Sequence, residues 1–341
     1  MKYVNLGNSG LEVSELCLGT WMFGTTLGTN TEVVNQSLAH EILDAAWAQG
    51  INFFDTANIY GSQNSERYIG EWLMDKDREN FVIASKVYFT TSGRQKIGLS
   101  RKIIMAEIES TLERLKTSYL DIYYIHGWHP TSPLEETLSA MNDLVRSGRV
   151  HYIGLSNISS AQLVKAAWIC EKYGWSPITV VQPRYNAADH VPYTVDPAEQ
   201  ALPDFFEVCR ELRIAVCPYA PLAGGFLTGK YEREADGKSS IPKGSRAALT
   251  DRYGSFPERW WRVLEAVREV ANELEVPLSQ VALRWAMLVD GVTSVPIVGA
   301  RLVEYLDDNV AALDVSLSTN QFNIIKEAGI YKELSPYIYT D

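Results

Sequence analysis

Four ionisable side chains of different kinds lie at or just beyond the ends of three short apolar runs. Asp55, Lys86 and His126 each end or directly follow one run, and Tyr60 comes shortly after Asp55. In a parallel α/β barrel the carboxyl ends of all strands open on one face, where residues far apart in sequence can meet. An acid, an ammonium, an imidazole and a phenol on one face indicate catalysis by proton transfer.

The phenol of Tyr60 needs help to exchange protons near neutral pH, because an unperturbed tyrosine has a pKa of about 10. A neighbouring ammonium would stabilise the phenolate and lower that pKa, and we expect Lys86 to supply it. Asp55 would keep Lys86 charged and oriented. His126 would polarise a substrate carbonyl or share the proton.

Each of the four residues also has a simpler structural interpretation. Asp55 fits a turn cap, Lys86 a solvated strand end, His126 a hydrogen-bonded core histidine and Tyr60 a packing residue. Their joint placement on one face of the expected barrel favours the catalytic interpretation.

The apolar pattern predicts alternating strands and helices along most of the chain. Residues 3–14 indicate a β-hairpin, which would plug the amino-terminal end of a barrel. Eight short strands separated mostly by helices favour a (β/α)8 TIM barrel over an open doubly wound sheet. Strands are expected at 16–19, 51–55, 81–86, 120–126, 151–155, 178–182, 214–218 and 293–297, and helices at 36–49, 64–75, 101–116, 134–147, 160–173, 203–212, 260–274, 278–289 and 302–312.

Two connections, 183–201 and 220–259, are long for a compact domain. Both follow strands, so we expect them to form lids or binding loops on the C-terminal face. The chain of 341 residues can bury a large core. We predict a single domain over residues 1–341, although length alone also allows two.

Composition favours a cytoplasmic protein with a small-molecule partner. The chain has 31 basic and 42 acidic residues, a net charge of −11, and lacks the basic run typical of nucleic-acid binding. Its four cysteines are widely spaced, which fits reduced thiols. With neither a CxxC nor an HExxH motif, no metal site is predicted. No apolar run reaches the roughly 18 residues of a membrane span.

The stretch from Ile51 to Gly61, continued by Ser65-Glu66, closely resembles the signature of the aldo-keto reductase superfamily. The resemblance spans about residues 3–313. It implies that Tyr60 is the general acid/base, that Lys86 and His126 tune it, and that Asp55 is the partner of Lys86. Later segments match in order: Ser85-Lys86, Ile125-His126, Gly154-Leu155-Ser156-Asn157, Val181-Gln182 and Tyr219-Ala220-Pro221-Leu222.

The resemblance also implies a nicotinamide cofactor bound without a Rossmann motif, with NADP(H) preferred and NAD(H) still possible. In that family the nicotinamide carboxamide is held by residues matching Ser156, Asn157 and Gln182, and the ring stacks on the residue matching Tyr219. Arg301 could pair with a 2′-phosphate or stack on adenine, or be a solvated helix start. The cofactor-binding candidates are Gly19, Thr20, Trp21, Asp55, Ser156, Asn157, Gln182, Tyr219, Pro221, Leu222, Gly224, Lys230, Gly299, Arg301, Asp308 and Asn309.

Residues 224–230 resemble a phosphate-binding P-loop and offer a competing interpretation. However, Tyr231 replaces the Ser or Thr that would bind Mg²⁺. The resemblance instead makes this segment a loop for the cofactor pyrophosphate. Residues 243–246 would extend it as a clasp or form a solvated basic loop.

Three aromatic residues, Trp21, Tyr88 and Trp128, follow strands and would line an apolar substrate pocket, although each also fits plain packing. The predicted activity is the reversible, NADPH-dependent reduction of an aldehyde or ketone to an alcohol. Hydride would come from nicotinamide and the proton from Tyr60. The alternative is a cofactor-binding regulatory protein resembling potassium-channel β subunits. A phosphate-binding barrel isomerase would not explain the nicotinamide-site residues.

Overall fold

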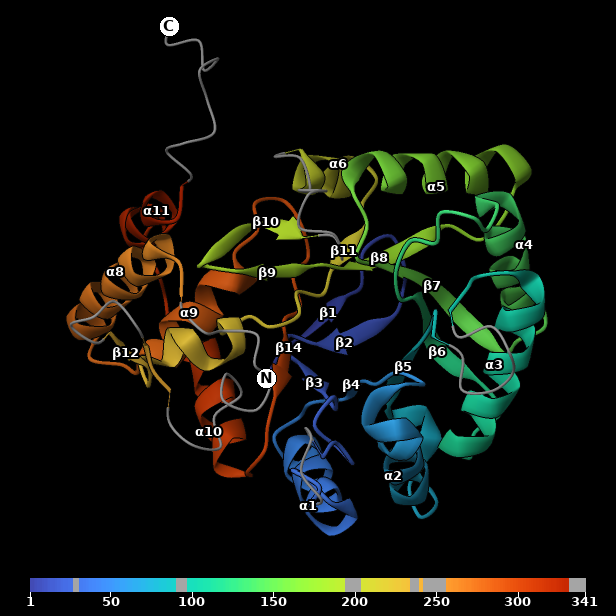
Figure 1. The fold of residues 1–341 in the computed structure, drawn as a ribbon, viewed down its shortest axis with the longest axis horizontal. Coiled ribbons are helices and arrows are strands. Elements are labelled where there is room, and N and C mark those ends of the chain that lie inside the picture. The colour runs from blue at the N-terminus through green and yellow to red at the C-terminus, as the bar shows by residue number, and fades with distance from the viewer. Residues whose placement is uncertain (27–30, 90–96, 194–203, 234–238, 242–255, 331–341) are drawn as a thin grey trace, which may run out of the picture.

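A barrel of eight parallel strands forms the centre of the molecule (Figure 1). The computed structural model describes residues 1–26, 31–89, 97–193, 204–233, 239–241 and 256–330. Parallel pairing runs in the order β11-β8-β7-β6-β5-β4-β3-β14. The strands are β3 (Cys17–Gly19), β4 (Phe53–Asp55), β5 (Val82–Val87), β6 (Leu120–Ile125), β7 (Val150–Ser156), β8 (Ile178–Gln182), β11 (Ala215–Val216) and β14 (Ile297–Gly299).

Two isolated bridges close the ring between β11 and β14. Val216 pairs with Ser294, and Tyr219 pairs with Ile297, both in parallel. The predicted (β/α)8 barrel is therefore confirmed. Because the strands are parallel, their carboxyl ends share one face, as the catalytic prediction requires.

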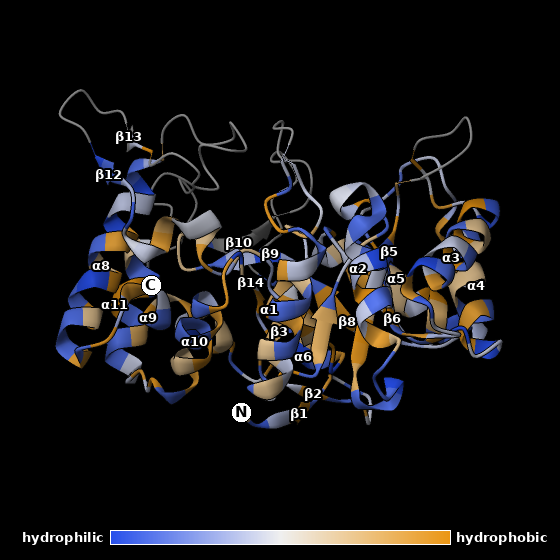
Figure 2. Cartoon of the chain, turned by 90° about the horizontal axis from the view of Figure 1, so that it is seen from below, coloured by the Kyte–Doolittle hydropathy of each residue, from blue (hydrophilic) through white to orange (hydrophobic). Residues whose placement is uncertain are grey.

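Helices surround the barrel and turn their apolar sides toward it. Ser159, the residue before α5, caps the helix with a capping box. Its side chain accepts from the backbone N–H of Gln162, and the Gln162 side chain accepts from the backbone N–H of Ser159. Figure 2 shows blue and orange sides on the helices and mostly orange strands. The helices are α1 (Gln36–Ala48), α2 (Asn64–Leu73), α3 (Arg101–Leu115), α4 (Leu134–Arg146), α5 (Ser160–Tyr173), α6 (Phe205–Glu211), α8 (Glu258–Leu274), α9 (Leu278–Met287), α10 (Glu304–Ala311) and α11 (Thr319–Ala328).

The N-terminal hairpin, β1 (Tyr3–Asn5) and β2 (Glu12–Ser14), closes the amino-terminal end of the barrel. Leu6 and Val13 are fully buried among barrel residues such as Phe53 and Val180. At Gly7, with φ of +60°, an added Cβ would lie 2.5 Å from the carbonyl oxygen of Thr179. The turn therefore needs glycine to fit against the strands. The expected plug is present, and it leaves the opposite face to the site.

Three parts of the fold differ from expectation. The last barrel strand begins at Ile297 rather than 293, because Pro296 has no N–H to donate to the ladder. The connection after β8 contains an antiparallel hairpin, β9 (Arg184–Asn186) and β10 (Asp189–Tyr193). Helix α11 was not expected, although a capping box of Ser318 and Gln321 marks its start.

The connection after β11 carries short elements: η3 (Ala223–Thr228), β12 (Glu232–Arg233) and β13 (Ser239–Ser240). A second apolar cluster holds η3 against α8. The ring centre of Phe226 lies 4.5 Å from that of Phe256 and 5.2 Å from that of Trp260. Shorter turns elsewhere are η1 (Tyr60–Gln63), η2 (Arg78–Asn80) and η4 (Ala312–Asp314). Within the described ranges, every helix is too short or too polar to cross a membrane.

Candidate active site

Lys86 and Asp55 form a buried ion pair at the carboxyl ends of β5 and β4. Lys86 Nζ donates to Asp55 Oδ2 at 2.6 Å and to the Thr56 carbonyl oxygen at 2.7 Å. Burial alone would lower the pKa of Lys86, but the Asp55 carboxylate and the Tyr60 phenol raise it above its usual value. Burial raises the pKa of Asp55, and the nearby ammonium opposes that rise. The pair therefore holds an ammonium charged inside a site that excludes water.

Tyr60 reaches this ammonium because of the turn that follows it. The three residues after Tyr60 have positive φ angles between 53° and 80°. A Cβ at Gly61 would lie 2.1 Å from the carbonyl oxygen of Phe23, so only glycine fits there. The turn brings the Tyr60 hydroxyl to 3.1 Å from Lys86 Nζ. The phenol oxygen thus lies within hydrogen-bonding distance of a buried positive charge.

His126 lies next to the phenol at the end of β6. Its ring centre is 6.0 Å from that of Tyr60 and 5.7 Å from that of Phe89, both in edge-on geometry. Its Nδ1 atom is buried and has no hydrogen-bond partner among the described residues. Burial and the charge of Lys86 hold the pKa of His126 well below its usual range. The imidazole is therefore neutral at neutral pH. The four ionisable residues predicted to meet do lie together.

A second polar group lies at the carboxyl ends of β7 and β8. Asn157 Nδ2 donates to the His126 carbonyl oxygen at 2.8 Å and to Ser156 Oγ at 3.0 Å. The Tyr219 hydroxyl donates to Asn157 Oδ1 at 2.8 Å, and Ser156 Oγ donates to the Gln182 carbonyl oxygen at 2.8 Å. The four predicted carboxamide and ring partners therefore form one connected network.

One hydrogen bond joins the two groups. Gln182 Nε2 donates to Asp55 Oδ1 at 2.8 Å, and both side chains are about 3% exposed. The acid that holds Lys86 thus also holds a residue of the second group. The contact was not predicted, since the two residues are 127 positions apart in sequence.

The glycine-rich segment after Pro221 and Leu222 forms the 3-10 turn η3. Gly224 and Gly225 have φ of 70° and 91°. Lys230 is exposed, and its Nζ would lie 2.5 Å from a Cβ added at Gly225. No helix begins at Lys230, so the segment lacks the geometry of a P-loop. The proposed clasp at 243–246 lies outside the described residues.

Four of the cofactor-binding candidates, Gly299, Arg301, Asp308 and Asn309, lie where β14 meets α10. Gly299 pairs with Gly19 across the two strand ends, is exposed, and has open space where a side chain would be. Arg301 is half-buried and Asn309 is buried. Asp308 accepts hydrogen bonds from the first turn of α9, with Ser279 Oγ at 2.5 Å and Gln280 Nε2 at 3.0 Å. Its carboxylate therefore docks α10 on α9.

The three aromatic candidates for a substrate pocket are all half-buried. Trp21, Tyr88 and Trp128 follow β3, β5 and β6 and pack against the main apolar cluster. The ring of Tyr88 meets Phe89 edge-on at 5.1 Å and His129 at 5.9 Å.

Sequence reasoning missed a hydroxyl cluster that supports the ion pair. Thr20 Oγ1 donates to the Asp55 carbonyl oxygen at 2.9 Å, and the Ser65 hydroxyl lies 2.7 Å from Thr20 Oγ1 and 2.8 Å from Thr56 Oγ1. Thr20, a predicted cofactor-binding residue, is fully buried and bonds the backbone of Asp55.

A buried charge pair behind β5 was also missed. Glu66 Oε1 accepts from Ser85 Oγ at 2.5 Å, and Glu66 Oε2 accepts from Arg114 Nε at 2.6 Å. Both Glu66 and Ser85 are fully buried. Ser65 and Glu66 stood in the matched signature, which is the signal that could have identified them.

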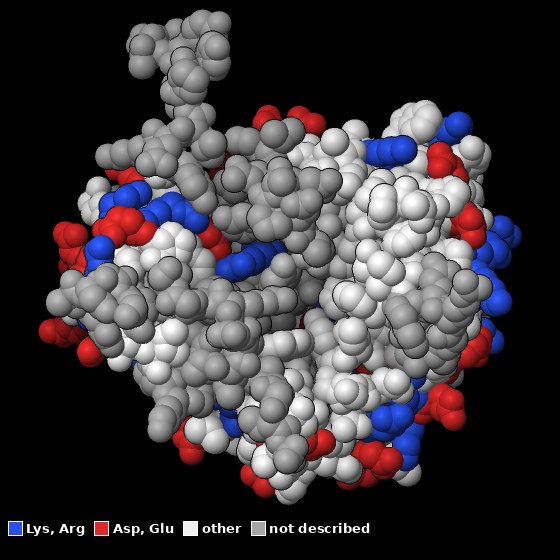
Figure 3. All heavy atoms as spheres, in the orientation of Figure 1, with Lys and Arg blue, Asp and Glu red and all other residues white. Residues whose placement is uncertain are grey.

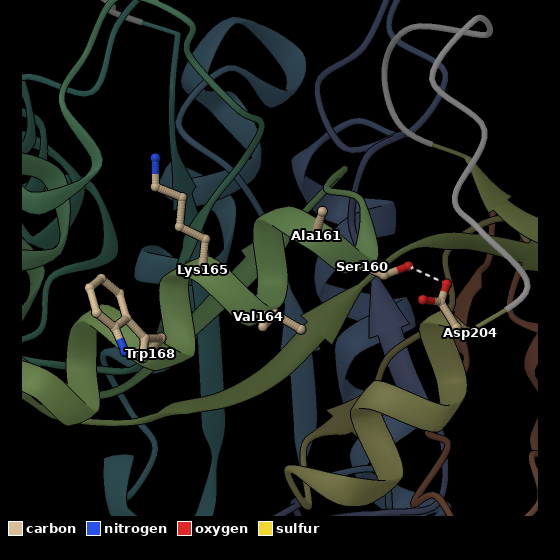
Figure 4. Close-up of a pocket in the computed structure, with 6 residues that line it drawn as sticks. All are labelled: Ser160, Ala161, Val164, Lys165, Trp168 and Asp204. Carbon is tan, nitrogen blue, oxygen red and sulfur yellow. Dashed lines mark hydrogen bonds between the residues drawn. The ribbon is translucent and has the colours of Figure 1, made fainter.

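The pocket drawn in Figure 4 lies away from the ionisable group. It is a cavity of about 400 Å³ over the outer side of α5, near the start of α6. Ser160 Oγ donates to Asp204 Oδ1 at 2.8 Å across its edge. Figure 3 shows acidic and basic side chains mainly around the periphery, with a hollow near the centre of the view. Among the described residues no cluster of His, Cys, Asp or Glu could hold a metal ion.

Comparisons with known proteins point to one family. The sequence model described as Aldo/keto reductase family matches residues 15–330. An uncharacterized oxidoreductase, YrpG, of Bacillus subtilis is 33% identical over 338 residues, covering 96% of this chain and 95% of the relative. A probable voltage-gated potassium channel β subunit of Oryza sativa is 33% identical over 322 residues, covering 92% of each. A crystallised thermostable aldo-keto reductase in complex with the inhibitor epalrestat is 28% identical, with a TM-score of 0.73 over 96% of this chain and 100% of the other.

Proposed function

Because the chain belongs to the aldo/keto reductase family, whose members are NAD(P)H-dependent oxidoreductases, we propose that it reduces an aldehyde or ketone reversibly with NADPH and that Tyr60 supplies the proton. One observation carries the proposal. The buried Lys86 ammonium contacts both the Asp55 carboxylate and the Tyr60 hydroxyl, at 2.6 and 3.1 Å. This is the arrangement that makes a phenol an effective acid near neutral pH.

Each of these side chains has a separate proposed role, which depends on its position. Tyr60 gives its proton to the carbonyl oxygen, and Lys86 stabilises the phenolate that remains. Asp55 keeps Lys86 charged and in place. Neutral His126 offers an N–H donor to the same carbonyl oxygen, since an uncharged imidazole always carries one N–H. Trp21, Tyr88 and Trp128 form the apolar wall that excludes water from a small carbonyl substrate.

The residues present fit a nicotinamide cofactor, which supplies the hydride when bound. Ser156, Asn157 and Gln182 offer hydroxyl and amide groups to a carboxamide, and Tyr219 offers a ring for stacking. The open space at Gly299 suits the close approach of a nucleotide to backbone. The proposed cofactor set otherwise comprises Gly19, Thr20, Trp21, Asp55, Pro221, Leu222, Gly224, Lys230, Arg301, Asp308 and Asn309.

The proposal extends to the choice of cofactor. A guanidinium beside the carboxyl end of β14 can pair with a 2′-phosphate, which NADPH has and NADH lacks. We therefore expect Arg301→Ala to weaken NADPH binding about tenfold and NADH binding much less, in a tryptophan-fluorescence titration. Equal losses for both cofactors would remove this role from Arg301. We also propose a cytoplasmic location and a single domain over residues 1–341.

The second candidate is a cofactor-binding regulatory subunit with little catalysis. Similarity to the rice potassium channel β subunit favours it. A screen of aldehydes, ketones and sugars with both cofactors distinguishes the two. Reduction of many substrate molecules per enzyme supports the reductase. If the protein binds NADPH but oxidises at most one equivalent with every substrate, the regulatory function is the better account.

A further inference from the structure

Asp55 divides its two carboxylate oxygens between two different residues. Oδ2 accepts from Lys86 Nζ at 2.6 Å, and Oδ1 accepts from Gln182 Nε2 at 2.8 Å. Asp55 and Gln182 are each about 3% exposed and Lys86 is fully buried. Bulk water therefore has little access to either bond, and a buried polar group that lost its partner would cost free energy.

This arrangement fixes the orientation of the Gln182 amide. An ionised carboxylate can only accept hydrogen bonds, so Gln182 must turn its amide nitrogen toward Asp55. Oε1 then lies at the end of the amide turned away from Asp55, where it can accept from a ligand, and Nε2 keeps one further N–H. A reversed amide would place Oε1 against a carboxylate oxygen, where two acceptors repel. The Asp55 charge thus decides which end of Gln182 a ligand meets.

Asn157 is oriented in a similar way. Its Nδ2 donates to the His126 carbonyl oxygen and to Ser156 Oγ, while its Oδ1 accepts from the Tyr219 hydroxyl. The side-chain amides of Gln182 and Asn157 both use their nitrogens on the protein. Gln182 Oε1, and the lone pair of Asn157 Oδ1 not used by Tyr219, suit the NH₂ end of a primary carboxamide, which is a donor.

We propose that Asp55 has a second role, in which it orients the nicotinamide carboxamide by fixing the Gln182 amide, in addition to holding Lys86. The inference rests on the proposed nicotinamide binding and gives Asp55, already a cofactor-binding candidate, a specific positioning role that acts through Gln182. One carboxylate then sets both the acid and the orientation of the hydride donor.

The test compares two oxidised cofactors that differ only at the carboxamide. In the 3-acetylpyridine analogue of NADP⁺ a methyl group replaces the NH₂, so the analogue cannot donate to Gln182 Oε1. Dissociation constants are measured by quenching of tryptophan fluorescence, without turnover. We expect the wild-type protein to prefer NADP⁺ about tenfold, the effect of one buried acceptor left without its donor.

Three variants identify the cause of that preference. In Gln182→Met the acceptor is gone, and in Asp55→Asn the Gln182 amide is free to turn either way. We expect the preference to fall below about threefold in both. Tyr60→Phe, the matched control, removes a hydroxyl that bonds Lys86 but not Gln182, and it should keep the wild-type preference. A general loosening of the site would weaken the binding of both nucleotides alike and leave the ratio of their dissociation constants unchanged.

The outcomes separate this inference from the proposed function. A wild-type protein that binds both nucleotides equally, or an Asp55→Asn variant that keeps the full preference, overturns the role of Asp55 while nicotinamide binding stands. Failure of the wild-type protein to bind either nucleotide would overturn the proposed function itself. Should Gln182→Met fail to fold, Asp55→Asn alone still decides the question.

Discussion

Lys86 Nζ donates hydrogen bonds to three oxygen atoms, which together fix the position of its charge in the active site. Its Nζ donates to a carboxylate, a backbone carbonyl and a phenol at 2.6, 2.7 and 3.1 Å. Charge-assisted bonds of this kind are about twice as strong as neutral ones. The bond to the phenol is the longest of the three. The proposed proton transfer from Tyr60 relies on this ammonium to stabilise the phenolate.

The first prediction concerns that proton. Tyr60→Phe keeps the ring and removes the hydroxyl, so NADPH should bind with nearly unchanged affinity. Turnover should fall by about two to four orders of magnitude, the usual contribution of a positioned general acid. Steady-state NADPH oxidation with a reducible aldehyde, beside a binding titration, measures both. Unchanged turnover would refute the assignment of Tyr60 as the acid.

The second prediction concerns pH and stability. Folded His126 stays neutral because burial and Lys86 hold its pKa well below its usual range. The unfolded chain binds a proton at this histidine below pH ~6.5, so stability falls as pH drops below that value. In His126→Gln this loss disappears. Between pH 7.5 and 5.5, urea unfolding should show a decrease in the free energy of unfolding about 1 kcal/mol larger in wild type than in the variant. Equal decreases in both would contradict the buried, neutral state.

At the scale of elements, the turn after β4 determines where the phenol lies. Gly61 combines a φ of 53° with a close approach to the Phe23 carbonyl oxygen. Gly148 offers a matched control, since its φ is +73° but an added Cβ would meet nothing within 4 Å. An alanine at either position would have the backbone strain of a left-handed residue, but only at Gly61 would its Cβ also clash.

The third prediction follows from this pair. Gly148→Ala should cost only about 1 kcal/mol in the free energy of unfolding, the strain of the left-handed conformation. Gly61→Ala should cost clearly more, and it should lower turnover far more than Gly148→Ala because Tyr60 is displaced from Lys86. Urea unfolding and NADPH oxidation test the pair. If both variants keep wild-type turnover, the turn does not position the acid.

At the scale of the whole molecule, the sequence predicts most of the barrel because each element carries its own local pattern. The signature around Tyr60 and the segments at 154–157 and 219–222 also predict which residues gather at the site. What escapes prediction depends on distant contacts. The Gln182–Asp55 bond joins residues 127 positions apart and follows from barrel closure. The local sequence around Thr20 likewise does not indicate that its hydroxyl bonds the Asp55 carbonyl oxygen on the neighbouring strand.

The last prediction uses the separation of the two barrel ends. Leu6, in the N-terminal hairpin, is fully buried at the amino-terminal end of the barrel. The active-site side chains lie at the opposite, carboxyl ends of the strands. Leu6→Ala should lower the free energy of unfolding by about 2–4 kcal/mol through loss of burial and creation of a cavity. Leu212→Ala, at a side chain that is 37% exposed, is the control and should cost much less. Neither change should alter NADPH affinity at 25 °C by more than about twofold, because the strands that carry the site keep their own hydrogen bonds. A tenfold loss of NADPH affinity in a folded Leu6→Ala protein would contradict this expectation. It would mean that packing at the amino-terminal end of the barrel is coupled to cofactor binding at the opposite end.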